Sequence, residues 1–237
     1  MTARLCLVEL RKLVDTVSGA VLIGVAVVLA GVFGGGALLV RPGASFSEVA
    51  QLAGVPGGTL VTVMAIMLVT AERTHRTALV TYVVTPRRGQ VVAAKAVAAA
   101  TLALTLVVLA VAAAAVIVPV GAVVTGKEAS WAVDAAALTS WAAGTLVGAL
   151  SGWALGLAIN NAPAAIVLVL VWPMATGLLA NVPALAPVLP WLDSAAVSGF
   201  GDGVDQGELG RFLTGLAVWV AVPAVVGLVR ALRGEVR

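Results

Sequence analysis

The sequence predicts an all-α integral membrane protein with six transmembrane helices. Of its 237 residues, 61% are hydrophobic and only 11% are charged, whereas a soluble domain has about 25% charged residues. The mean hydropathy is +1.11. The apolar residues also fall into six long runs separated by polar segments, and about 20 apolar residues are enough to cross a bilayer. We therefore treat residues 1–237 as a single transmembrane domain.

Residues 3–15 precede the first apolar run and have a polar and an apolar face when drawn as a helix. The apolar face carries Cys6, Leu7, Leu10, Leu13 and Val14. This pattern favours an amphipathic helix lying at the inner membrane surface; the alternative is a basic flank that only sets topology. Residues 17–40 are too long an apolar run for the core of a signal peptide, so we expect them to form the first span.

The remaining spans are expected at about 56–71, 91–124, 135–159, 164–179 and 212–229. Residues 41–55 are interpreted as a polar loop containing glycine and proline. The third span would be about 51 Å long, against a hydrocarbon core of about 30 Å, so it must tilt, bend or project beyond the membrane. We expect Pro119 to break it near its far end.

Two connections carry further expectations. Asn160 to Pro163 should form a tight inner turn. The proline-rich segment 181–208, which precedes the last span, is apolar enough in its middle to lie at the outer membrane surface or to re-enter it.

The charged residues predict the orientation of the chain. Eleven of the 14 basic residues fall in segments on one side of six spans: Arg4, Arg11, Lys12, Arg73, Arg76, Arg87, Arg88, Lys95, Arg230, Arg233 and Arg237. The other side holds Arg41, Lys127 and Arg211. Because basic residues are retained on the cytoplasmic side, we expect a multi-pass protein of the cytoplasmic (inner) membrane with both termini cytoplasmic. The basic residues cluster at membrane boundaries, so the net charge of +3 does not indicate nucleic-acid binding.

Four glycines recur at intervals of four residues in the fourth span: Gly144, Gly148, Gly152 and Gly156. This spacing places them on one helix face, where another backbone can approach closely. The alternative is chance, in a chain with 26 glycines. The partner helix could belong to the same subunit or to another.

The basic segment between the second and third spans is the most informative motif. Its residues Glu72, Thr77, Thr85-Pro86-Arg87-Arg88 and Lys95 resemble the corresponding loop of ABC-2 type transporter permeases. The residues Glu9, Lys12-Leu13 and Ser18 resemble the amphipathic entry helix of that family. Six spans, a long third span and a proline-rich outer segment extend the resemblance over nearly the whole chain. The sequence departs from the family at Arg76, where glycine is frequent.

This resemblance implies a transport subunit with a cytoplasmic coupling helix between spans 2 and 3. The expected partners are two copies of a cytoplasmic ABC ATPase subunit and a second permease, identical or homologous, within the lipid bilayer. ATP and Mg would bind the ATPase, and this chain would hold no cofactor or metal. The residues expected to couple the two subunits are Glu72, Arg76, Thr77, Tyr82, Pro86 and Arg87. Alternatively, the basic residues of this segment are topology charges only.

The chain has no ATP-hydrolysing site that the sequence reveals. Residues 121–127 match the spacing of a phosphate-binding loop, but Glu128 stands where a serine or threonine should bind magnesium. We interpret this match as accidental.

Three other function classes are left open by the residues themselves. An ion-coupled secondary transporter would need ionisable groups deep in the membrane, and the spans contain few. A membrane enzyme is disfavoured because the single histidine, His75, has no companion ligands or catalytic partners in the sequence. A structural or assembly protein is the third alternative. For a transporter, an amphiphilic, drug-like, lipid or peptide substrate moving outward is expected; Trp172 and Trp219 are candidates for its path, or else make packing or lipid contacts.

Overall fold

The computed structural model describes residues 17–74, 88–192 and 206–233. All regular secondary structure in these ranges is helical, and six of the helices are long and apolar enough to cross a membrane. The predicted all-α class is therefore correct, and the protein is a multi-pass membrane protein. The predicted interfacial helix at 3–15 and the predicted coupling helix lie outside the described residues.

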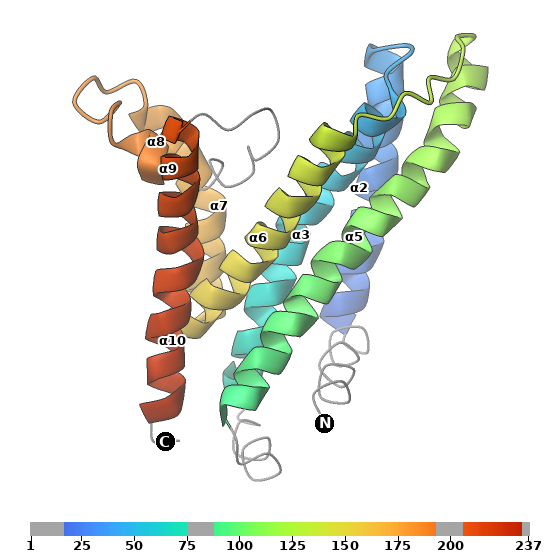
Figure 1. The fold of residues 1–237 in the computed structure, drawn as a ribbon. Coiled ribbons are helices and arrows are strands. Elements are labelled where there is room, and N and C mark those ends of the chain that lie inside the picture. Colours follow the sequence, from blue (N-terminus) through green and yellow to red (C-terminus); the bar gives the residue numbers. More distant parts are fainter. Residues whose placement is uncertain (1–16, 75–87, 193–205, 234–237) are drawn as a thin grey trace.

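Four long helices form one group (Figure 1): α2 (Val17–Val40), α3 (Phe46–Thr74), α5 (Arg88–Thr125) and α6 (Ala135–Ile159). A second group contains α7 (Ala162–Leu179), the short α8 (Leu189–Leu192), and a continuous helix made of α9 (Gln206–Leu216), the π-helical turn η2 (Ala217–Ala221) and α10 (Val222–Arg233). Helix α6 contacts α10 and η2 as well as α3, so it joins the two groups.

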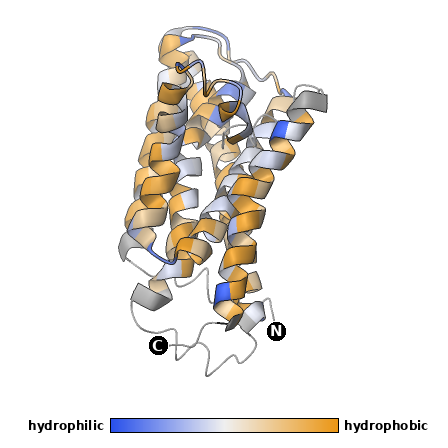
Figure 2. Ribbon diagram, turned by 90° about the vertical axis from the view of Figure 1, so that its left-hand side faces the viewer, coloured by the Kyte–Doolittle hydropathy of each residue, from blue (hydrophilic) through white to orange (hydrophobic). Residues whose placement is uncertain are grey.

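The start of α2, the end of α3, the start of α5 and the end of α10 all lie at one end of the bundle (Figure 1). We call it the basic end, and define it by Thr74, Arg88 and Arg233. The opposite end carries the connections after Val40 and after Thr125. Figure 2 shows that apolar residues dominate the helices between the two ends.

Helix α3 begins ten residues earlier than the expected second span, so the prediction of a loop over 41–55 is wrong from Phe46 onward. The cause is a capping box. The backbone N–H of Ser45 donates to Glu48 Oε2 (2.7 Å), and that of Glu48 donates to Ser45 Oγ (3.3 Å). This reciprocal pair satisfies two of the N–H groups that a helix start leaves without partners.

Helix α5 runs through Pro119 to Thr125, so the predicted break at Pro119 is also wrong. Proline removes the hydrogen bond to the carbonyl four residues earlier, but Ala115 and Pro119 both lie on an exposed face. On the other face Ala114 and Val118 are buried against α2 and α3. Packing on this face holds the helix together across the missing bond. The phosphate-loop-like residues Gly121 to Thr125 are the last turn of this helix.

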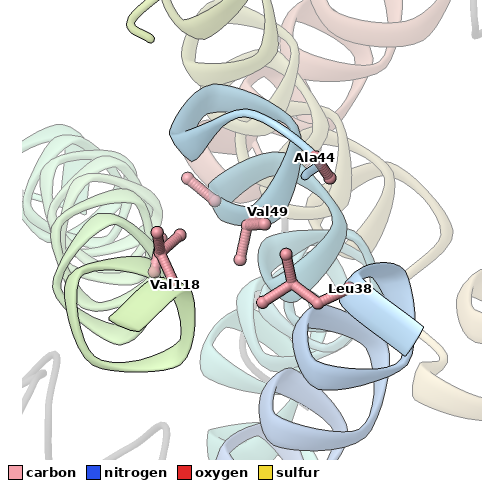
Figure 3. Close-up of a cluster of buried hydrophobic side chains, with 6 residues drawn as sticks. Leu38, Ala44, Val49 and Val118 are labelled. Carbon is pink, nitrogen blue, oxygen red and sulfur yellow. The ribbon is translucent and has the colours of Figure 1, made fainter. Parts of the chain in front are cut away.

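Helix α3 is the central element of the first group. Half of its most apolar window is buried, more than in any other described span. It packs against α2, α5 and α6. Near the opposite end, Leu38 of α2, Val49 of α3 and Val118 of α5 meet in a buried cluster that includes Ala44 (Figure 3).

Many large apolar side chains of α2, α5 and α7 are exposed, for example Val28, Val108 and Met174, which are 64%, 66% and 71% exposed. A helix that is apolar on every side belongs in a core or in a membrane. Lipid contact accounts for these exposed faces.

Candidate functional site

The structure describes the frame of the predicted coupling segment but not the segment itself. Glu72 lies in the last turn of α3, whereas Arg76, Thr77, Tyr82, Pro86 and Arg87 fall in 75–87, outside the described residues. What is described is the pair of helices that enter and leave this segment: α3 up to Thr74 and α5 from Arg88. Residues 75–87 therefore follow directly on the central helix of the first group.

Lys95 joins these two helices near the basic end. Its side chain is only 4% exposed, and its Nζ donates a hydrogen bond to the backbone carbonyl of Leu68 in α3 (2.8 Å). Around it, Met64 and Leu68 of α3 pack with Ala98 of α5. A buried ammonium needs such a partner, because an unpaired buried charge costs several kcal/mol. The contact joins α5 to α3 close to the two helix ends that residues 75–87 connect.

Sequence reasoning counted Lys95 among the charges of the polar segment and did not recognise it as buried. A signal was present, because residues four positions apart share a helix face, and Val91 and Ala99 are apolar. Both are buried beside Lys95. The signal could not be used from the sequence, since the other faces of this helix are also apolar.

The glycine stripe of α6 lies against α3. A Cβ atom added at Gly152 would lie 2.4 Å from the carbonyl oxygen of Thr62, and one at Gly156 would lie 3.2 Å from the backbone of Ile66. At Gly148 the nearest atom is the side-chain Oγ1 of Thr62, at 3.2 Å. Gly144, one turn earlier in α6, is half-buried. The partner of the stripe, which the sequence left open, is thus a helix of the same chain.

Trp172 and Trp219 come together in the second group. Their ring centroids are 5.4 Å apart with the planes at 57°. Both indole Nε1–H groups donate to the same acceptor, the carbonyl oxygen of Leu192, at 3.1 and 3.0 Å. Leu192 is the last residue of α8, so the pair fastens the segment that follows α7 to both α7 and η2. The structure places both tryptophans in a packed contact between helices.

The second group is also joined to α6 at the basic end. The carbonyl of Ala158, in the last turn of α6, accepts a hydrogen bond from the guanidinium of Arg230 in α10. Next to it, Gly227 approaches Leu157 so closely that an added Cβ would lie 2.5 Å from its side chain. A cation beside the final carbonyls of a helix is favourable because those groups carry partial negative charge.

Within 17–74, 88–192 and 206–233, no group of three or more histidine, cysteine, aspartate or glutamate side chains is placed to hold a metal ion. His75 and Cys6 lie outside these ranges.

In comparisons with known proteins, no protein-family model, no curated protein and no solved structure matches the chain.

Proposed function

We propose that the protein is the membrane-spanning permease subunit of an ATP-driven exporter of the ABC-2 type. A separate cytoplasmic ATPase binds and hydrolyses ATP, and residues 75–87 receive its movement. In this arrangement the basic end faces the cytoplasm, in keeping with the charge distribution of the sequence. The substrate is amphiphilic: a drug-like molecule, a lipid or a peptide.

The observation that carries the proposal is the attachment of the basic segment to α3. This helix is the most enclosed of the described spans, and it contacts α2, α5 and α6. Lys95 links its basic end to α5 through the Leu68 carbonyl. Packed helices are close to incompressible, so a displacement at residues 75–87 is passed to the whole first group rather than absorbed at the membrane surface.

In this proposal, the displacement is passed on to the second group of helices. Helix α6 contacts both groups, and its glycine stripe holds it closely against α3. A movement of α3 therefore reaches α10 and η2 through α6. Trp172 and Trp219, which both donate to the Leu192 carbonyl in the second group, stay the candidates for the substrate route.

The test is mild extraction of the tagged protein from its native membranes, followed by identification of the proteins that accompany it. We expect an ATPase subunit in stoichiometric amount, and we expect it to be lost when Pro86 and Arg87 are both replaced by alanine. The matched control is Lys127→Ala, which removes one positive charge at the opposite end. No ATPase in the extract, under conditions that keep a known transporter intact, would overturn the proposal.

An ion-coupled carrier is the second candidate, and Lys95 is the observation that favours it. An ionisable side chain buried in a span is a candidate for ion or proton coupling. Its hydrogen bond to the Leu68 carbonyl supports a structural role instead. Reconstituted protein that transports substrate down an ion gradient, without any ATPase, would establish the carrier.

A further inference from the structure

A small cavity lies between α2 and α3 at the opposite end of the bundle, away from the residues assigned to the proposed function. Its volume is about 170 Å³. Three of the six lining residues are polar or charged; the six are Ala37, Arg41, Ala44, Glu48, Gln51 and Leu52. The lining therefore combines a cation, an anion and an amide with three apolar residues.

The cavity lies where two spans end. Arg41 directly follows the apolar stretch Ala20–Val40, and Glu48 is in the first turn of the next span. On α3, Glu48, Leu52 and Val55 follow one another at intervals of four and three residues, so they share one helix face. All three are exposed. The exposed stripe of α3 thus passes from apolar side chains to a carboxylate in the first turn of the span.

The two charges face each other without a hydrogen bond. Arg41 Nη1 and Glu48 Oε1 are 4.0 Å apart, and the side chains are 75% and 49% exposed. The other carboxylate oxygen of Glu48 is held by the backbone N–H of Ser45. An exposed pair at this separation contributes little to stability. It leaves N–H groups of Arg41 and one oxygen of Glu48 available to a ligand.

The walls of the cavity are held in place by packing behind them. Ala44 belongs to the buried cluster with Leu38 and Val49 (Figure 3). Ser47, which is 1% exposed, accepts a hydrogen bond from the backbone N–H of Asp134 (2.7 Å). Because these contacts fix the start of α3, the positions of Glu48 and Gln51 are set before a ligand arrives, which lowers the cost of binding.

We propose that this cavity binds the headgroup of a phospholipid that carries one phosphate and one primary ammonium group. Arg41 binds the phosphate, and Glu48 accepts hydrogen bonds from the ammonium. Gln51 can donate to a phosphate or ester oxygen. One acyl chain lies along Leu52 and Val55. The proposal does not depend on the export reaction.

The pairing of charges sets the selectivity. A glycerol headgroup has a phosphate but no cation, so it leaves the carboxylate of Glu48 beside a second negative charge. A choline headgroup has the cation but no N–H to donate. Charge-assisted hydrogen bonds are about twice as strong as neutral ones, so an ethanolamine headgroup is expected to bind best of the three.

The experiment measures which lipid stays bound. Purified protein is delipidated, incubated with an equimolar mixture of ethanolamine, choline and glycerol phospholipids of identical chains, and analysed by native mass spectrometry. We expect preferential retention of the ethanolamine lipid, falling about tenfold in Arg41→Gln, since one charge-assisted hydrogen bond is lost. Glu48→Gln should remove the preference over the glycerol lipid. Lys127→Gln, which removes a cation outside the cavity, is the matched control.

Two further arms complete the test. Water-soluble glycerophosphoethanolamine has the headgroup but no acyl chain. It should displace the lipid only at a much higher concentration, because the proposed site also binds an acyl chain. Displacement at a similar concentration would show that only the headgroup is bound and would contradict the acyl-chain contact. Arg41→Lys keeps the charge and should retain an intermediate amount, which covers the case in which Arg41→Gln does not fold. Equal retention of the three lipids by the parent protein, or equal loss in the Lys127 variant, would overturn the proposal.

Discussion

Lys95 shows how much a single side chain can contribute to the organisation of this protein. It is a basic residue near the start of a long apolar helix, yet it is buried and bonded to a carbonyl of the neighbouring helix. The Leu68 carbonyl lies more than one turn before the end of α3. The Lys95 side chain therefore adds a hydrogen bond to the apolar packing of the two helices that flank residues 75–87.

Gly152 is the residue of the α6 glycine stripe whose substitution the fold tolerates least. An added Cβ would meet the backbone of Thr62 at 2.4 Å, and backbone cannot move aside as a flexible side chain can. We expect Gly152→Ala to lower the free energy of unfolding by about 1–3 kcal/mol, the usual cost of overpacking. Thermal unfolding in detergent, followed by circular dichroism, measures the change.

The matched control is Gly24→Ala in α2, because a Cβ at Gly24 has no neighbouring atom within 4 Å. Alanine favours helix over glycine by up to about 1 kcal/mol, so this variant should be as stable as the parent or more so. Equal destabilisation of both variants would show that α6 does not pack against α3 in this way.

At the scale of elements, α8 is positioned by two other helices rather than by its own length. It has four residues, too few to form an independent helix. The Trp172 and Trp219 indoles fix its last carbonyl, and the Trp191 ring lies 3.3 Å from where a Cβ at Gly210 of α9 would be. Trp219 is the buried residue of η2, and π-helical turns often occur at functional sites.

Because two donors share one acceptor, their removal should not be additive. In Trp172→Phe or Trp219→Phe alone, the Leu192 carbonyl keeps one partner, and we expect a loss of stability below about 1 kcal/mol. The double variant leaves that carbonyl without either indole, and should cost about 1 kcal/mol more than the sum of the two single changes. Thermal unfolding of the four proteins completes this cycle.

Trp153→Phe is the matched control for the same change. The indole nitrogen of Trp153 is buried without a hydrogen-bond partner among the described residues, so no bond is lost. Additive effects of Trp172→Phe and Trp219→Phe would contradict the shared-acceptor arrangement.

At the scale of the whole molecule, the two groups of helices meet mainly along α6. The basic segment is joined to the first group, and the Trp172–Trp219 pair lies in the second. If an ATPase acts on residues 75–87, its effect reaches the pair mainly across the α3–α6 contact, with smaller direct contacts between α3 and α7 and between α5 and α10. Coupling between the two ends of the molecule therefore depends mainly on rigid packing over the α3–α6 contact.

Reversal of charge in the basic segment tests the proposed role of this segment in coupling. In the Arg87→Glu/Arg88→Glu double variant we expect transport, and the stimulation of ATPase activity by substrate, to fall at least about tenfold, equivalent to about 1.4 kcal/mol of lost interaction. Membrane insertion should be unchanged. Lys127→Glu, a charge reversal at the opposite end, should leave both activities intact, and normal coupling in the double variant would contradict the proposed role of residues 75–87.

Much of the fold could be predicted from local sequence. The helices at Val17–Val40 and Ala135–Ile159 have the bounds that their apolar runs indicate. The start of α3 was missed although Ser45 and Glu48 have the spacing of a capping box, because the glycines and prolines around them favoured a loop. At Pro119 the helix continues although proline disfavours it, because Ala114 and Val118 on the other face are packed in the core.

The sequence by itself determined that this chain has six helices long and apolar enough to cross a membrane, and it predicts that most basic residues lie on one side, because hydropathy and charge are sums over neighbouring residues. Tertiary structure alone decided which helix the glycine stripe meets, that Lys95 is buried against Leu68, that one carbonyl joins Trp172 to Trp219, and that Arg41 and Glu48 share a cavity. In a chain with apolar residues on every helix face, the amphipathic pattern that would reveal the partner of each face is missing. The partner of each helix face is therefore determined only by how the helices pack.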